Sequence, residues 1–265
     1  MPDRAATPAT SHFSPLQALA VFAVVVLLLA AASLPLAWLR DQFSALSAIA
    51  AGQLLLIGGI PLSFAALRYG RGWAAALGLG RPKRRRLLGA VLCGASFWYL
   101  NGLFFVPIGE ELVGGSEALE ELEAMVSTAP LVWVLVTLAV IPAAAEEILF
   151  RGLLLPALRP GIGTALAVLV SAALFSFFHF SRIQLVPTFA FGLLLGYASV
   201  QGNVVVSMLM HLINNTAALL LSTSRLDTLN ELLSDHPGWV GPPAALICLT
   251  GLTLLHSQPH RQGEN

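Results

Sequence analysis

Long apolar stretches recur along this chain and constrain its fold more than any other feature. Charged residues make up 11% of its 265 residues, against about 25% in an ordinary soluble domain, and 57% are hydrophobic. A helix needs roughly 20 apolar residues to cross a hydrocarbon core of about 30 Å. Eight stretches approach that length, at about residues 15–39, 44–67, 87–107, 129–157, 164–180, 183–200, 204–222 and 240–256, of which the fifth, sixth and eighth are short. The sequence therefore predicts an all-α, polytopic membrane protein with about eight transmembrane helices.

These stretches leave room for one transmembrane domain, residues 15–256, between a cytoplasmic tail (1–14) and a C-terminal tail (257–265). The first apolar run is longer than the roughly 7 to 15 residues typical of a signal peptide, so we interpret it as a membrane anchor. Cys93 and Cys248 fall inside predicted spans, without metal-ligand or redox spacing around them, and are expected to be packing residues.

The distribution of charge predicts the orientation in the membrane. Seven of the fourteen basic residues lie between the second and third spans: Arg68, Arg71, Arg81, Lys83, Arg84, Arg85 and Arg86. Basic loops stay in the cytoplasm, which puts both termini there as well. The next connection, "GEELVGGSEALEELEAM", carries six glutamates and no base, so we expect it outside. Its apolar residues Leu119, Leu122 and Met125 recur every three residues, which predicts an amphipathic helix on the membrane surface.

Charges inside the predicted spans are confined to a few places. Glu146, Glu147 and Arg151 interrupt the fourth span, His179 ends the fifth, and His211 lies within the seventh together with two asparagines. An intramembrane acid or arginine costs about 2.5 to 3.5 kcal/mol, so a function or a partner is the default explanation. These three spans are therefore expected to face one another.

Helix geometry gives the two glutamates different tasks. Glu147 and Arg151 are four residues apart with the acid first, which is the favoured order for an ion pair on one helix face. Glu146 is turned about 100° away from that face. One carboxylate is thus neutralised, and the other stays available in an apolar chamber to take a proton from water. His211 and Asn215 are also four apart and project together from their helix.

Counting residues tests whether these groups can meet. If the fourth and fifth spans form a hairpin about the turn signal "RPGIG" at 159–163, Glu146 lies beside position 178 and its neighbour His179. That level is about 24 Å from the turn, whereas His211 lies only about 12 Å past the next turn on that side. A tilt, a broken helix or a shortened fifth span has to close the difference.

In this order the polar residues resemble a known family, the CaaX-processing and bacteriocin-processing (CPBP) intramembrane proteases. The family pattern is EExxxR, then FxxxH, then HxxxN, on separate membrane helices. Glu146 and Glu147 with Arg151 match the first element, Phe175 with His179 the second, and His211 with Asn215 the third. The resemblance covers about 75 residues, 142–217, within a similar eight-span plan.

The resemblance implies an intramembrane endopeptidase in which Glu146 activates water. It implies that His179 assists, that His211 and Asn215 stabilise the oxyanion, and that Glu147 and Arg151 support the site. No cofactor is needed on this interpretation. Zinc stays an alternative, since Glu146, His179 and His211 could bind it with a fourth position open for water, although the chain has no HExxH helix and Asn215 would be a poor ligand.

Two non-proteolytic functions stay open. The polar cluster could form the proton relay of a proton-coupled transporter, although no second copy of the charged segment indicates an inverted repeat. Alternatively, the chain could be a membrane scaffold or immunity protein without catalysis. Each element also has a structural interpretation: Phe175 as packing, His211 with Asn215 as a link between helices.

The expected partners are the lipid bilayer and a membrane-associated peptide or protein substrate, such as the lipid-modified CaaX proteins that the resemblance implies. Nucleic acid is not expected, because the basic loop is accounted for by topology and lipid headgroups. Thirteen arginines against one lysine suggest a GC-rich genome and so a bacterial cell membrane. The sequence makes no prediction of the oligomeric state.

Overall fold

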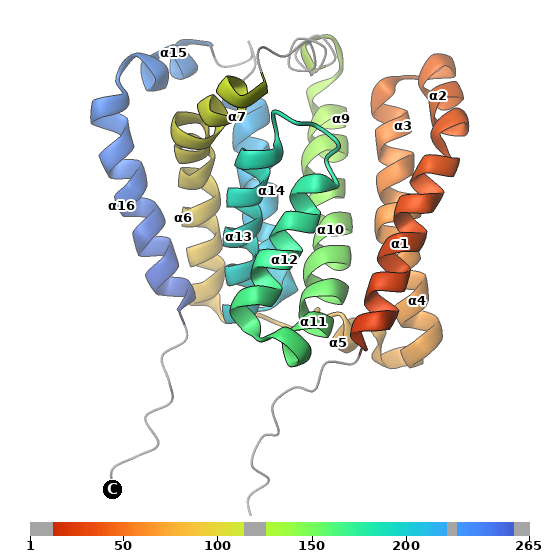
Figure 1. Ribbon diagram of the computed structural model, residues 1–265. Helices are drawn as coiled ribbons and strands as arrows, with labels where there is room; N and C mark the ends of the chain where they lie inside the picture. The colour runs from red at the N-terminus through yellow and green to blue at the C-terminus, as the bar shows by residue number, and fades with distance from the viewer. Residues whose placement is uncertain (1–12, 114–125, 222–226, 257–265) are drawn as a thin grey trace, which may run out of the picture.

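The computed structural model describes residues 13–113, 126–221 and 227–256, and throughout these residues the only regular secondary structure is helical. Figure 1 shows the long helices standing side by side as a bundle. The amphipathic helix predicted around Leu119, Leu122 and Met125 lies outside the described residues.

The helices follow the order of the apolar stretches. Their bounds are α1 (Pro15–Ala31), α2 (Ser33–Gln42), α3 (Ala45–Ala51), η1 (Gly52–Gly58), α4 (Gly59–Tyr69), η2 (Gly70–Gly72), α5 (Trp73–Ala76), α6 (Arg84–Leu100), η3 (Asn101–Phe105), α7 (Val106–Val113), α9 (Leu131–Leu135), η4 (Val136–Val140), α10 (Ile141–Glu147), η5 (Ile148–Leu154), α11 (Leu155–Ile162), α12 (Thr164–Phe177), α13 (Leu185–Gln201), α14 (Val204–Leu221), α15 (Asp227–Asp235) and α16 (Pro237–Leu255). Four of these, η1, η3, η4 and η5, are π-helical turns that continue the helix on either side.

Local sequence signals set several of these boundaries. Ser14 caps α1 in a capping box with Gln17, and Pro15 occupies the first turn, where its missing N–H costs nothing. Ser44 caps α3 by accepting from the backbone N–H of Ser47. Gly163, at φ 78°, ends α11 in a conformation that residues with a side chain rarely adopt.

Fewer than eight helices in the described part of the chain are long enough to cross a membrane. Among the described residues, five continuous helices pass on length and hydropathy, at 45–76, 84–112, 131–162, 204–221 and 237–255. The pair α1 and α2 makes a sixth if the two count as one span bent by 52°. The protein is therefore an integral, multi-pass membrane protein, but the prediction of eight spans is not confirmed.

The fifth and sixth apolar stretches are the ones that fall short. The 14 residues of α12 extend about 21 Å, less than a hydrocarbon core of about 30 Å. The helix ends at Phe177, Phe180 turns the chain with φ 50°, and the Ser176 hydroxyl donates to the carbonyl of Leu185 at 2.6 Å. This early end leaves His179 in the connection between α12 and α13.

The ends of the bundle agree with the arrangement expected from charge. The start of α1, the basic connection from α4 to α6, the turn between α11 and α12, and the end of α16 all lie at the lower end in Figure 1. The acidic α7 lies at the opposite end.

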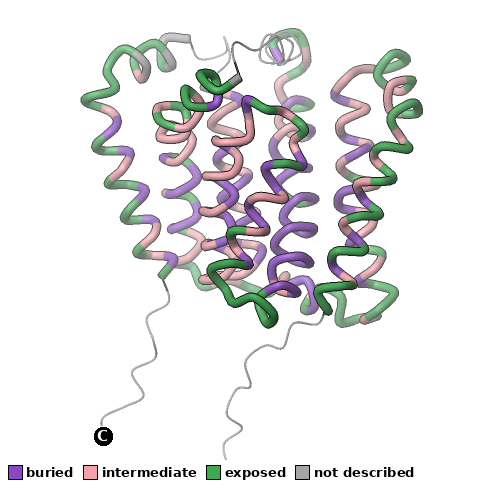
Figure 2. Tube along the Cα trace, viewed as in Figure 1, coloured by how far each residue is buried: buried purple, intermediate pink, exposed green. Residues whose placement is uncertain are grey.

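Burial is greatest in the helix that carries the glutamates. Every residue of η5 is buried, and so is every residue of α10 except Ala144, whereas α1, α2 and α16 expose much of their surface (Figure 2). The helix packs against η1 and α14, which brings segments far apart in sequence to the two glutamates. Cys93 and Cys248 are free and buried, as expected of packing residues.

Gly94 allows α6 to approach α14, the helix that carries His211. A Cβ at Gly94 would lie 2.6 Å from the carbonyl oxygen of Met210. We therefore expect Gly94→Ala to lower the free energy of unfolding by about 1–3 kcal/mol, because backbone has to shift. Gly102, with nothing within 4 Å of its added Cβ, is the matched control, and Gly102→Ala should be neutral or stabilising. Thermal unfolding in mild detergent measures the stability of both variants. Equal stabilities of Gly94→Ala and Gly102→Ala would contradict the close approach of α6 to α14.

Candidate active site

Glu147 and Arg151 form the ion pair that their spacing predicts. An Nη1 hydrogen of Arg151 is donated to Glu147 Oε1 at 2.8 Å, and neither side chain is accessible to solvent. Arg151 also donates from Nη2 to the carbonyl of Gly192 at 3.0 Å and lies over the ring of Phe175 at 4.5 Å. The pair can be buried completely because the carboxylate and the guanidinium neutralise each other and the guanidinium has further partners.

His211 binds the same carboxylate from a different helix. Its Nδ1 lies 3.1 Å from Glu147 Oε1, and since an ionised carboxylate only accepts, Nδ1 carries the hydrogen. The other ring nitrogen, Nε2, faces Glu146 Oε2 at 3.9 Å. That distance exceeds a hydrogen bond and leaves room for a water molecule that contacts both atoms.

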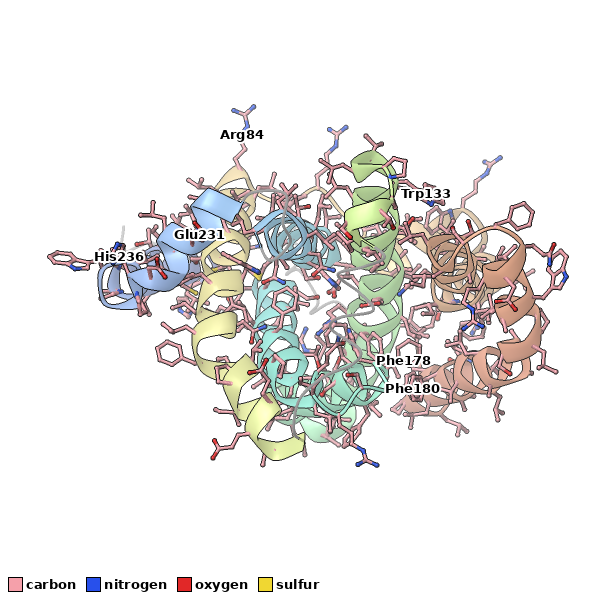
Figure 3. The ribbon with its side chains drawn as sticks, turned by 90° about the horizontal axis from the view of Figure 1, so that it is seen from above. Arg84, Trp133, Phe178, Phe180, Glu231 and His236 are labelled. Atoms are coloured by element: carbon pink, nitrogen blue, oxygen red, sulfur yellow. The ribbon has the colours of Figure 1, made fainter. Side chains whose placement is uncertain are left out.

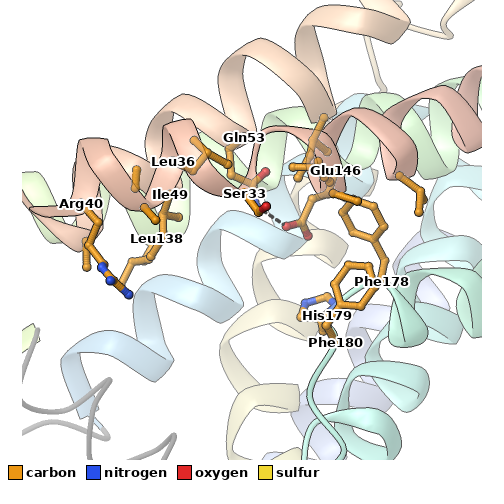
Figure 4. A pocket seen from close by; sticks show the side chains of 18 of the residues that line it. Ser33, Leu36, Arg40, Ile49, Gln53, Leu138, Glu146, Phe178, His179 and Phe180 are labelled. Atoms are coloured by element: carbon orange, nitrogen blue, oxygen red, sulfur yellow. Dashed lines mark hydrogen bonds between the residues drawn. The ribbon is translucent and has the colours of Figure 1, made fainter.

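Glu146 has a different environment from its neighbour. Its Oε1 accepts a hydrogen bond of 2.7 Å from the side-chain amide of Gln53 in η1, and the residue lines a pocket (Figure 4). Within the described part of the chain no arginine or lysine pairs with it, whereas Glu147 is paired with Arg151. Glu146 is buried too, at 6% exposed, but its carboxylate is the one that lines the pocket.

His179 lines the same pocket, beside Phe178 and Phe180 (Figure 4). Its Nδ1 lies 2.8 Å from the carbonyl oxygen of Phe175, which can only accept, so Nδ1 carries a hydrogen. In the neutral ring, Nε2 then has its lone pair available. The sequence arithmetic that set Glu146 beside positions 178 and 179 agrees with this shared pocket.

The ring of Phe175 packs against both histidines and the arginine of the site. Its ring meets His179 edge to face at 4.8 Å and His211 at 5.9 Å, and Arg151 lies over it at 4.5 Å. The residue is 1% exposed. Its interpretation as a packing residue is therefore confirmed, and what it packs is the site itself.

Asn215 is bonded to backbone beside the pocket of Glu146. Its Nδ2 donates to the carbonyl of Leu138 at 3.2 Å, while the neighbouring Asn214 donates to Asn215 Oδ1 at 3.4 Å. Asn215 does not line the pocket of Glu146, although Leu138 does. The structure thus brings together Glu146, Glu147, Arg151, His179 and His211, and connects Asn215 to the pocket only through Leu138 of η4.

Glu146 and His211 lie at one level despite the difference in depth expected from counting, since Glu146 Oε2 is 3.9 Å from His211 Nε2. The π-helical stretch η5, between Glu146 and the turn at Gly163, winds more residues into each turn and so accounts for a small part of that difference.

The pocket that Glu146 faces has a volume of about 930 Å³ and is lined mainly by apolar residues of α1, α2, α3 and η1. Its polar lining residues are Ser33, Arg40, Gln53, Glu146, His179 and Gln184. Seen from above, Phe178 and Phe180 lie on the side of the bundle that faces α1 and α2 (Figure 3). The N-terminal helices thus complete a chamber whose reactive groups come from elsewhere in the chain.

Zinc binding by Glu146, His179 and His211, the alternative considered from the sequence, stays a prediction. The bonds of His211 Nδ1 to Glu147 and of His179 Nδ1 to a backbone carbonyl leave Nε2 of each ring free, as in a metal-binding histidine. Among the described residues, however, no three His, Cys, Asp or Glu side chains are grouped so that they could hold a metal ion, so we derive no step through a metal.

Gln53 is the residue of this site that sequence reasoning missed. Gln53 is not among the charged residues inside the predicted spans, because its amide is neutral. Its sequence context, "AGQLLLIGGI", does contain a signal: a lone strongly polar residue in an otherwise apolar span.

One comparison with known proteins matches this chain. The family described as type II CAAX prenyl endopeptidase Rce1-like matches residues 128–217, which include every motif residue and exclude the N-terminal helices that carry Gln53. No curated protein and no solved structure matches. The segment 128–217, with the paired glutamates and the two histidines gathered around them, is thus similar to the Rce1-like family.

Proposed function

We propose that the protein is an intramembrane endopeptidase in which Glu146 is the general base. One observation carries this proposal: adjacent glutamates have opposite environments. Glu147 is held by Arg151 and His211 without access to solvent, whereas Glu146 faces a pocket that also contains His179. A base needs an unpaired carboxylate within reach of water and substrate.

In the first step, a water molecule between Glu146 Oε2 and His211 Nε2 gives a proton to Glu146. The resulting hydroxide attacks the carbonyl carbon of the scissile peptide bond, and the negative charge moves to the carbonyl oxygen. His179, held through Nδ1 by Phe175, assists from the other side of the pocket by accepting a hydrogen bond from water at Nε2.

In the second step, the oxyanion collapses and the C–N bond breaks. Glu146 returns its proton to the leaving nitrogen, so the products are a carboxylic acid and an amine. A His211 ring that carries a hydrogen on both nitrogens throughout the reaction stabilises the oxyanion by donating from Nε2, while Nδ1 donates to Glu147. Asn215 donates one amide hydrogen to the carbonyl of Leu138 and keeps a second, which can serve as a further donor to the oxyanion once the side chain reaches the pocket.

The chamber favours substrates that already reside in the membrane. Its lining is mainly apolar, and a lipid-modified or membrane-spanning peptide can enter it without leaving an apolar environment. We propose such peptides, including CaaX-type substrates, as partners of this chain, with no nucleic acid. We also propose that no cofactor takes part and that the protein resides in a bacterial cell membrane.

The test uses purified protein in lipid nanodiscs. Comparing wild-type and Glu146→Ala membranes by proteomics identifies peptides that accumulate uncut, and one of these serves as substrate. We expect cleavage that persists within about twofold after stringent chelation, in protein shown to be metal-free by elemental analysis. Loss of cleavage on chelation with recovery by zinc would overturn the metal-free mechanism. Failure of the purified protein to cut any peptide, with or without metal, would favour a transporter or a scaffold.

A further inference from the structure

We infer that Gln53 is a positioning residue that orients the carboxylate of Glu146 for proton transfer. This inference rests on the proposed function and adds a residue from outside the family match. Its basis is the 2.7 Å hydrogen bond from Gln53 Nε2 to Glu146 Oε1.

The backbone brings η1 and α10 unusually close at this point. A Cβ at Gly58, one turn or so beyond Gln53, would lie 3.1 Å from the Cβ of Ala145, the residue before Glu146. Gln53 lies within the π-helical turn η1, a kind of distortion that often aims a side chain at a functional site. The amide is thus held opposite the carboxylate by packing of the two helices.

The bond assigns the two oxygens of Glu146 different tasks. Oε1 is occupied by Gln53, while Oε2 faces His211 Nε2 at 3.9 Å, where the attacking water would lie. Without the amide, the carboxylate could rotate about its last torsion, which is a soft one. Orientation of a reacting group within a fraction of an ångström is what such a bond supplies.

An amide suits this task better than a cation would. Gln53 donates without carrying charge, so it holds Glu146 without competing for the proton that a base must take. Arg151, by contrast, forms a buried ion pair with Glu147. The charged and titratable groups that surround Glu146 are Glu147 on its own helix, Arg151 in η5, His211 on α14, His179 after α12 and, across the pocket, Arg40 on α2.

Gln53 Oε1 is consistent with this orientation. It is buried and has no hydrogen-bond partner within the described part of the chain. The carboxylate can bind only the N–H side of the amide, so the side chain keeps this orientation although its oxygen gains no bond. A residue retained for packing alone would not need an amide here.

The first measurement is the cleavage rate of Gln53→Met, which keeps the length of the side chain and removes the donor. We expect kcat to fall about 10- to 100-fold with KM changed less than about twofold, because the base is misoriented while the pocket keeps its shape. Gln53→Asn, which keeps the amide but shortens its reach, should lose less than Gln53→Met. Gln42→Met makes the same change at an exposed position of α2 and should leave kcat unchanged.

The second measurement repeats Gln53→Met in the Glu146→Gln background, with enough protein to follow residual cleavage. If Gln53 acts through Glu146, no further loss should appear. Wild-type kcat in Gln53→Met, or the same loss in both backgrounds, would overturn the inference. If Gln53→Met does not fold, Gln53→Asn replaces it in the test, and a kcat of Gln53→Asn equal to that of the wild type would overturn the inference. Full cleavage by Glu146→Gln alone would instead reject the proposed function, so the two failures are distinct.

Discussion

Glu146→Gln is expected to lower kcat by about 10²- to 10⁴-fold, the contribution typical of a general base. The substitution keeps the size of the side chain and leaves an oxygen that can still accept from Gln53, so the bundle should fold unchanged. The loss follows because an amide cannot take a proton from water. Cleavage of a membrane-anchored peptide by purified protein in nanodiscs measures the rate, and thermal unfolding checks the fold.

Glu110→Gln is the matched control for this variant. Glu110 makes the same chemical change possible on the exposed surface of α7, away from the pocket. Its kcat should equal that of the wild type. If Glu146→Gln cut peptide as fast as this control, Glu146 would not be the base.

Arg151→Met is expected to have the largest effect on stability, lowering the free energy of unfolding by about 3–5 kcal/mol. The substitution leaves Glu147 as a buried charge without its cation. It also removes the donor to the carbonyl of Gly192 and the cation from the ring of Phe175. Thermal or SDS-induced unfolding in mild detergent measures the change.

A double variant separates loss of the arginine from loss of the pair. Glu147→Gln combined with Arg151→Met removes both charges, so it should be less destabilised than Arg151→Met alone. Arg71→Met, at an exposed position of η2, should change stability by less than about 0.5 kcal/mol. If Arg151→Met were as stable as Arg71→Met, the buried pair would contribute little to the free energy of unfolding.

The two glutamates illustrate how a membrane protein can keep a reactive carboxylate next to a structural one. Both lie on one helix, and consecutive helical residues point about 100° apart. Glu147 therefore faces Arg151 and His211, while Glu146 faces Gln53 and the pocket. His211 contacts Glu147 through Nδ1 and faces Glu146 through Nε2, so it connects the structural carboxylate to the reactive one.

Much of the site could be predicted because its spacing is local. The Glu147 to Arg151 pair depends only on residues four apart on one helix, and the structure contains it. Counting residues about a single turn also predicted that Glu146 and His179 lie near each other, and both line one pocket. Gln53 could not be found in this way, since it lies 93 residues before Glu146 and its amide carries no charge.

The apolar stretches by themselves determined an all-helical, multi-pass protein with its polar groups gathered on a few helices, because hydropathy and helical periodicity are properties of consecutive residues. Tertiary structure alone decided three features: the number of helices long enough to span the membrane, the residue at which α12 ends, and the amide that binds Glu146. These features depend on contacts between segments distant in sequence, such as Ser176 with Leu185 and η1 with α10. Such contacts form only when distant segments pack together, so a stretch of consecutive residues does not reveal them.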